Sequence, residues 1–122
     1  MTKRKTTVLL ADDEPMILRL LHRLLDSHEH AEIVGEATDG LETLELTRSL
    51  EPDVIVLDHS MPGMTGMEVA ERVLSENPDQ RIILFSAMAQ GELAERARQL
   101  GIATLAKTDV SLIVDLLAPG AL

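Results

Sequence analysis

Five short apolar runs, each followed by an amphipathic stretch, leave this chain few ways to fold. The runs predict strands at residues 7–11, 32–37, 53–57, 81–85 and 102–106. Apolar residues at helical spacing predict helices at residues 17–25, 41–50, 67–74, 93–100 and 110–118. Strands that alternate with helices form a parallel sheet covered on both faces, joined by right-handed crossovers. The pattern therefore predicts a small doubly wound α/β domain with a five-stranded parallel sheet.

Single residues mark some of the expected boundaries. Asp39 stands where the N-cap of the second helix is predicted, and Gly101 stands at the expected C-cap of the fourth. The third apolar run, residues 53–57, is nearly all β-branched. Such a run is typical of a central parallel strand that is buried on both faces.

The size and charge of the chain exclude several classes of protein. Its 122 residues suit one domain, and no apolar run reaches the roughly 18–20 residues that span a bilayer. The apolar stretch after the basic N-terminal residues is too short for a signal peptide. A net charge of −10 opposes direct binding of nucleic acid, and the absence of cysteine excludes disulfides and thiolate metal sites. We expect a cytoplasmic location.

Polar side chains follow four of the five predicted strands at the point where each strand ends. Asp12 and Asp13 follow the first strand, Asp58 the third, Ser86 the fourth and Lys107 the fifth. Any one of them alone is explained as a turn residue, a helix cap or a surface charge. In doubly wound domains, however, ligands bind outside the carboxyl ends of the strands. The set therefore predicts a pocket where carboxylates, a hydroxyl and an ammonium group converge.

Clustered carboxylates repel one another, so they either raise a pKa or hold a cation. Oxygen ligands with retained waters favour Mg²⁺ over Zn²⁺. The metal neutralises the cluster and clamps the oxygens of an incoming phosphoryl group. A carboxylate can act as the nucleophile in such a site, giving an acyl phosphate, and a lysine supplies further positive charge. This chemistry predicts phosphoryl transfer to a carboxylate.

The order and spacing of these residues resemble the receiver domain of two-component response regulators over about residues 7–118. The motifs that carry the resemblance are the Asp12-Asp13 pair, the Asp58-x-x-Met61-Pro62-x-x-x-Gly66 stretch, Ser86-Ala87 and Lys107. The resemblance implies a flavodoxin-like (βα)5 fold. It also implies a single receiver domain over residues 1–122, with about residues 1–6 and 119–122 as flexible ends.

The resemblance implies that Asp58 is the phosphoacceptor, supplied by a phosphohistidine on a sensor histidine kinase or a histidine phosphotransfer protein. Asp13 and Asp58 would ligate Mg²⁺ directly, Asp12 would act through water, and Ser60 would contribute its backbone carbonyl. Mn²⁺ is expected to substitute for Mg²⁺. Such a domain catalyses only its own phosphorylation and dephosphorylation, so we do not expect an enzyme in the usual sense.

Other site residues have implied roles around the phosphoryl group. Lys107 and the Ser86 hydroxyl would bond its oxygens, and the small Ala87 would leave room for it. His59 follows the acceptor and is expected to influence access to it or hydrolysis. Phosphorylation would then switch the surface of the fourth helix, fifth strand and fifth helix, and so control a partner or an output domain.

Two positions depart from the family pattern. Proline often follows the lysine in this family, with a cis peptide bond, whereas Thr108 follows it here. An aromatic residue usually stands three positions before the lysine, and Thr104 takes that place, which excludes an aromatic switch there. Phe85, the only aromatic residue of the chain, is predicted to lie in the core.

The last predicted helix, residues 110–118, is apolar around nearly its whole circumference, with only Ser111 and Asp115 polar. A helix on a sheet needs a single apolar stripe. Either this helix lies unusually deep in the core, or Leu112 or Leu116 faces a partner. The partner would be an output domain or a second copy of the chain, in a homodimer built on the fifth helix with the fourth or the first.

Three other functions are compatible with this architecture. An aspartate-nucleophile phosphatase needs a general acid two residues after the nucleophile, where this chain has Ser60. A nucleotide- or flavin-binding domain needs a glycine-rich loop after the first strand, where this chain has acidic residues. A degenerate receiver that acts as a phosphorylation-independent interaction module is the remaining alternative, and the complete set of site residues argues against it.

The output expected from the sequence is transcription regulation. Residues 33–40 and the Lys107-Thr108-Asp109 ending are most similar to receivers of helix-turn-helix, LuxR-type regulators. This similarity predicts control of a DNA-binding domain, to which Pro119-Gly120 would begin a linker; a stand-alone receiver is the alternative.

Overall fold

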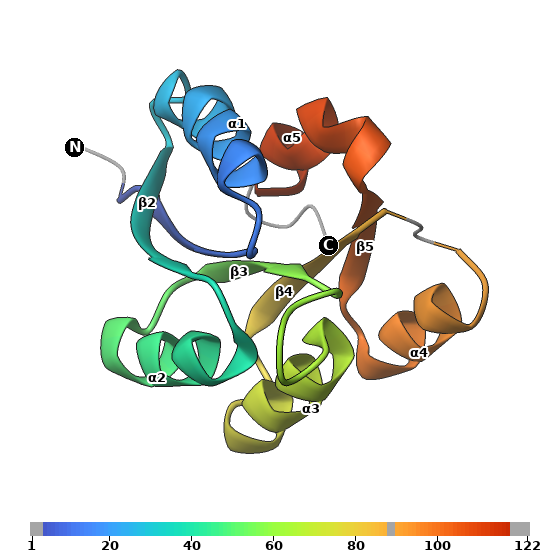
Figure 1. The fold of residues 1–122 in the computed structure, drawn as a ribbon. Coiled ribbons are helices and arrows are strands. Elements are labelled where there is room, and N and C mark those ends of the chain that lie inside the picture. The colour runs from blue at the N-terminus through green and yellow to red at the C-terminus, as the bar shows by residue number, and fades with distance from the viewer. Residues whose placement is uncertain (1–3, 88–89, 118–122) are drawn as a thin grey trace.

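The computed structural model describes residues 4–87 and 90–117, and it shows strands and helices in strict alternation (Figure 1). No helix in these ranges is long and apolar enough to cross a bilayer. The elements in chain order are β1 (Thr6–Ala11), α1 (Pro15–Asp26), β2 (Ala31–Ala37), α2 (Gly40–Leu50), β3 (Val54–Asp58), α3 (Gly66–Glu76), β4 (Arg81–Ser86), α4 (Glu92–Leu100), β5 (Ala103–Ala106), the 3₁₀ helix η1 (Lys107–Leu112) and α5 (Ile113–Leu117).

The five strands form one parallel sheet in the order β2-β1-β3-β4-β5, as the alternation predicts. From β1 the chain first adds β2 on one side, then crosses to add β3, β4 and β5 on the other. The strand order therefore reverses between β1 and β3. In doubly wound sheets, ligands bind at such a point, outside the carboxyl ends of the strands.

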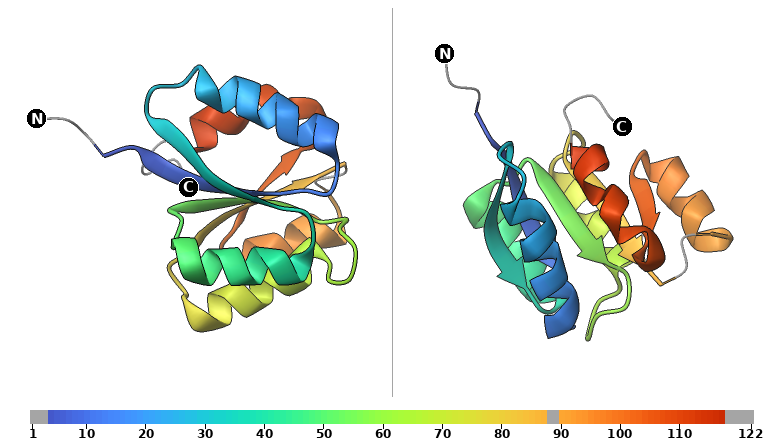
Figure 2. Two further views of the ribbon diagram at one scale, coloured as in Figure 1. Left: turned by 60° about the vertical axis from the view of Figure 1, so that its left-hand side comes forward. Right: turned by 90° about the horizontal axis from the view of Figure 1, so that it is seen from above.

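Helices cover both faces of the sheet, as Figures 1 and 2 show. Helices α1 and α5 pack on one face, and α2, α3 and α4 pack on the other, so the sheet separates two apolar clusters. Every residue of β3 is buried because this strand lies in the middle of the sheet. Phe85 on β4 is 1% exposed, which confirms the prediction that it lies in the core.

The helix boundaries follow from capping residues. Asp39 is the N-cap of α2, where its Oδ1 accepts a hydrogen bond from the Glu42 amide at 2.8 Å. Gly101 ends α4 with a φ of 75°, a conformation that glycine adopts without steric cost. Both residues were predicted as caps. Thr65 and Glu68 form a capping box at the start of α3, a signal that was present in the sequence but not used.

The last predicted helix is wrong in part. A regular helix over residues 110–118 was expected, but the chain forms the 3₁₀ helix η1 from Lys107 to Leu112 and the α-helix only from Ile113 to Leu117. Asp109 lies in a non-helical conformation, and the surrounding threonine, valine and serine are weak helix formers. The expected final residue, Ala118, lies outside the described residues.

One side of this segment is buried and the other is exposed. Ile113 and Leu117 are buried against α1 and the sheet, whereas Leu112 is 49% exposed and Leu116 is half-buried. The carbonyl of Leu116 accepts a hydrogen bond from Arg81 on β4 at 2.8 Å. The segment therefore packs through one stripe, and Leu112 is the large apolar residue that it leaves on the surface.

Candidate functional site

The residues expected at the strand ends lie at one edge of the sheet. Asp12 directly follows β1, Asp58 is the last residue of β3, and Lys107 directly follows β5. The register places Asp58 opposite Phe85 and Ser86 opposite Ala106. The side chains of Asp12, Asp58, Ser86 and Lys107 therefore come from the ends of four adjacent strands. This edge adjoins the reversal of strand order between β1 and β3, where the fold predicts a ligand site.

Three carboxylates meet at this edge. Asp12, Asp13 and Asp58 each offer an oxygen, and these oxygens all lie within 4.8 Å of one another. Asp12 and Asp58 are buried, while Asp13 is exposed to solvent. The Oδ2 atoms of Asp12 and Asp58 are both buried; Asp12 Oδ2 pairs with the ammonium of Lys107, and Asp58 Oδ2 accepts no hydrogen bond. A buried carboxylate oxygen without a donor is costly, so this donor set fits a hard divalent cation such as Mg²⁺.

Lys107 is the cation that the chain itself supplies. Its Nζ lies 3.2 Å from Asp12 Oδ2, 3.3 Å from Asp58 Oδ1 and 3.1 Å from Glu14 Oε1. Burial alone would lower the pKa of Lys107, but the hydrogen bond to Glu14 and the charges of Asp12 and Asp58 outweigh it, so its pKa is raised. Lys107 is therefore charged at neutral pH and offsets part of the negative charge of the cluster.

The electrostatics at Asp58 differ from those of an ordinary aspartate. Burial, and then the charge of Asp12, raise the pKa of Asp58 from 3.8 to about 6, against the opposing effects of Lys107 and of the Ser60 amide. The carboxyl group is thus ionised at neutral pH at an energetic cost. A carboxylate in this state gains from any cation or electrophile that reaches it.

Hydrogen bonds from backbone amides two residues further along the chain orient both buried carboxylates. The Glu14 amide donates to Asp12 Oδ1 at 2.9 Å, and the Ser60 amide donates to Asp58 Oδ1 at 3.3 Å. Each carboxylate therefore has its Oδ1 held by the backbone, while Asp12 Oδ2 pairs with Lys107 and Asp58 Oδ2 accepts no hydrogen bond. The role of Glu14 as a partner of Lys107 was not foreseen, although its position beside the acidic pair was a usable signal.

The loop between β3 and α3 packs tightly against Asp58. A Cβ atom built on Gly66 would lie 2.4 Å from the Asp58 carbonyl oxygen and 2.7 Å from the His59 Cα. Only glycine allows α3 to start this close to the end of β3. The backbone of Asp58 is therefore in direct contact with the first residue of α3.

The remaining expected residues surround this edge. Ser86 is buried at the end of β4, and Ala87 is exposed beside it. Thr104 is half-buried on β5, and, as expected, no aromatic residue stands at that position. Among the described residues there are no cis peptide bonds, so the bond between Lys107 and Thr108 is trans.

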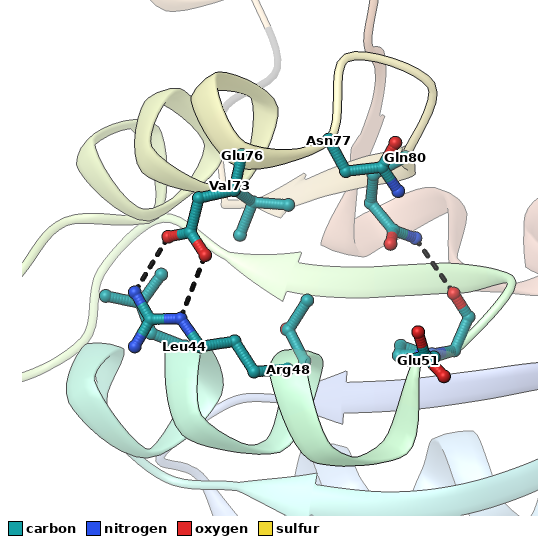
Figure 3. A pocket seen from close by; sticks show the side chains of 9 residues that line it. Leu44, Arg48, Glu51, Val73, Glu76, Asn77 and Gln80 are labelled. Carbon is teal, nitrogen blue, oxygen red and sulfur yellow. Dashed lines mark hydrogen bonds and ion pairs between the residues drawn. The ribbon is translucent and has the colours of Figure 1, made fainter.

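A groove of about 300 Å³ lies away from this site, between α2 and α3 (Figure 3). Its lining includes Pro52 and Gln80, which precede β3 and β4, so it lies toward the amino ends of those strands. Arg48 and Glu76 form a two-bonded ion pair across it, at 2.9 and 2.7 Å. The groove is therefore separate from the acidic cluster.

An acidic cluster that contacts a lysine, at the switch point of a (βα)5 sheet, is typical of a class of signalling domain. The sequence model of the response regulator receiver domain matches residues 8–114. The chain belongs to this family, as its motifs predicted.

Similar proteins agree with this assignment. The nitrate/nitrite response regulator protein NarL of Escherichia coli is 40% identical over 80 residues, which are 66% of this chain and 37% of NarL. The probable transcriptional regulatory protein NarL of Mycobacterium tuberculosis is 38% identical over 99 residues, covering 81% of this chain and 46% of that protein. The chain thus spans less than half the length of these relatives.

Solved structures match the whole fold. The signal receiver domain of NarL from Mycobacterium tuberculosis superposes with a TM-score of 0.80 at 32% identity, covering 94% of this chain and 98% of that one. The response regulator domain of CheB from Thermotoga maritima gives a TM-score of 0.82 at 27% identity, covering 93% and 92%. These matches confirm the flavodoxin-like parallel sheet.

Proposed function

We propose that this receiver domain is a Mg²⁺-dependent phosphorylation switch in a phosphorelay, with Asp58 as the phosphoacceptor. The observation that carries the proposal is the state of Asp58, a buried carboxylate with a raised pKa, an Oδ2 that accepts no hydrogen bond, and a lysine 3.3 Å from its Oδ1. Such a group is ready to react with an electrophile that brings a cation with it.

Asp13 and Asp58 are proposed as direct ligands of the metal, with Asp12 acting through water and the backbone carbonyl of Ser60 completing the protein ligands. When bound, Mg²⁺ or Mn²⁺ neutralises these carboxylates and offers contacts to the phosphoryl oxygens. The three clustered carboxylates and the buried Oδ2 of Asp58, which accepts no hydrogen bond, support this ligand set.

The donor is proposed to be a phosphohistidine on a sensor histidine kinase or a phosphotransfer protein. An oxygen of the Asp58 carboxylate attacks phosphorus, the phosphorus–nitrogen bond breaks, and the electron pair leaves with the imidazole. Lys107 then pairs with the phosphoryl group, and the Ser86 hydroxyl donates a hydrogen bond to one of its oxygens. Ala87 is small enough to leave space for that group.

The switch is proposed to act through the α4–β5–α5 surface. Lys107 is also the first residue of η1, so a shift of its ammonium group toward a phosphoryl oxygen would pull on the segment that leads into α5. Moving a two-state equilibrium from 1:99 to 99:1 needs about 5.5 kcal/mol. Charge-assisted hydrogen bonds of about 1.5–3 kcal/mol each, from Lys107 and Ser86, are of the right size.

The proposed output is control of a partner or an attached domain, as a cytoplasmic signal. Leu112 is 49% exposed on η1, which supports a homodimer or a domain contact that involves α5 together with α4 or α1. Regulation of transcription is proposed by similarity to the two NarL proteins. The receiver itself, with a net charge of −10, is not proposed to bind nucleic acid.

The test is phosphate uptake measured by intact mass after incubation with acetyl phosphate. We expect the wild type to gain one phosphoryl group with Mg²⁺ and none with a chelator, and Asp58→Asn to gain none. Asp79→Asn, an exposed aspartate on the α3–β4 loop, is the matched control and should behave as the wild type. A wild type that neither gains phosphate nor binds Mg²⁺ by calorimetry would instead be the phosphorylation-independent interaction module.

A further inference from the structure

His59 binds α3 through both its backbone and its side chain. Its carbonyl oxygen accepts a hydrogen bond from the Gly66 amide at 2.8 Å, and its Nδ1 accepts one from the Met67 amide at 3.3 Å. Its own amide donates to the Phe85 carbonyl at the end of β4, at 3.2 Å. One residue, directly after the phosphoacceptor, therefore ties together the ends of β3 and β4 and the start of α3.

These bonds complete the cap of α3. The first amides of a helix have no acceptor within the helix. Thr65 Oγ1 accepts from the amide of Glu68, the third helical residue, and His59 accepts from the amides of Gly66 and Met67, the first two. The side chain of His59 thus acts as a capping group that comes from outside the helix.

We propose that the imidazole of His59 is a positioning residue of the phosphoacceptor loop. By accepting the Met67 amide, it holds residues 58–60 against α3 and β4, and so places the Asp58 carboxylate and the Ser60 carbonyl for the metal and the phosphoryl group. This inference rests on the proposed role of Asp58, and it assigns to His59 a mechanical role rather than one in proton transfer.

The coupling to the acceptor is direct. The Ser60 amide donates to Asp58 Oδ1 at 3.3 Å, so a shift of the backbone after His59 also moves the donor that orients the carboxylate. Gly66 already lies so close to the Asp58 carbonyl that α3 cannot move nearer to the end of β3. Loss of the imidazole acceptor would leave the Met67 amide without this hydrogen bond. The contact between residues 58–60 and α3 would then loosen.

A side chain that replaces His59 must carry an acceptor if the hydrogen bond from the Met67 amide is to be kept. Asparagine carries an acceptor oxygen on Cγ, as histidine carries Nδ1 on Cγ, so His59→Asn can keep the bond to the Met67 amide. Leucine is of similar size but has no acceptor. The pair His59→Asn and His59→Leu therefore separates the hydrogen bond from the volume of the side chain. His30→Leu, an exposed histidine on another loop, is the matched control.

The experiment compares these variants in two measurements, the hydrogen exchange rate of the Met67 amide by NMR and the Mg²⁺ affinity by calorimetry. Loss of one hydrogen bond corresponds to a change of about fivefold. We expect His59→Leu to exchange Met67 about fivefold faster and to bind Mg²⁺ about fivefold more weakly. His59→Asn and His30→Leu should stay within about twofold of the wild type in both.

Two results would overturn the inference. One is a His59→Leu protein with wild-type Mg²⁺ affinity. The other is a His59→Asn protein that keeps Met67 protected but binds Mg²⁺ as weakly as the leucine variant, since the hydrogen bond would then not position the site. A wild type that neither binds Mg²⁺ nor takes up phosphate would refute the proposed function as well, and this is detected before any variant is compared.

Discussion

Replacing Asp58 with asparagine is expected to stabilise the folded domain by about 2 kcal/mol at pH 7.5 in metal-free buffer. The reason is that the ionised carboxylate is held at a cost. A pKa raised from 3.8 to about 6 corresponds to roughly 3 kcal/mol against the charged form in the folded state. A buried asparagine amide with incomplete hydrogen bonding is expected to offset about 1 kcal/mol of that gain.

The effect should depend on pH with a definite sign. Because the pKa of Asp58 is raised in the folded state, its contribution to stability is complete below pH 3.8 and is lost as the pH rises through about 6. The advantage of Asp58→Asn over the wild type should therefore grow by about 1 kcal/mol between pH 5 and pH 7.5. The isoelectric point of about 4.7 makes pH 5 a practical lower limit.

The measurement is urea unfolding followed by far-ultraviolet circular dichroism, since the chain has no tryptophan or tyrosine for fluorescence. Asp13→Asn is the matched control, because Asp13 is exposed and its removal relieves no burial. Saturating Mg²⁺ should stabilise the wild type and reduce its deficit relative to Asp58→Asn. An Asp58→Asn protein that is less stable than the wild type at pH 7.5 without metal would show that the buried carboxylate is not strained.

Much of the fold could be predicted because its central strands, β1, β3 and β4, are largely buried on both faces. A central strand such as β3 is a continuous apolar run, so its position is evident without any knowledge of its neighbours. The alternation of such runs with helical periodicity then leaves one architecture. The site was predictable for a related reason, since the carboxyl ends of parallel strands meet at one edge. Asp12, Asp58 and Lys107 are far apart in the chain, but each stands at or directly after the carboxyl end of its own strand.

Features that depend on contacts between the strand ends could not be predicted from the sequence. A regular helix is expected over residues 110–118, but Lys107 is held by Asp12, Glu14 and Asp58, and the chain leaves β5 through the 3₁₀ helix η1. The residues that follow have weak helix propensity, so they follow the tertiary constraint. The bond from the Met67 amide to His59 was likewise invisible, because a histidine eight residues upstream is not a usual helix cap.

Replacing Gly66 with alanine is expected to destabilise the domain by about 3 kcal/mol and to weaken Mg²⁺ binding together with it. The new Cβ would lie 2.4 Å from the Asp58 carbonyl oxygen and 3.0 Å from its carbonyl carbon. These are backbone atoms, which cannot rotate away as a side chain can. The start of α3 must therefore move away from the end of β3, and that movement displaces Asp58.

Gly63, in the same loop, provides the matched control for this steric effect. Its φ is 83°, and a Cβ built there meets nothing within 4 Å, so Gly63→Ala suffers only conformational strain of about 1 kcal/mol. Urea unfolding and Mg²⁺ calorimetry on both variants separate the two causes. If Gly66→Ala loses no more stability than Gly63→Ala, the loop adjusts without cost and α3 does not hold Asp58 in place. If Gly66→Ala alone loses both stability and metal affinity, the packing of α3 on Asp58 is what shapes the proposed phosphoacceptor site.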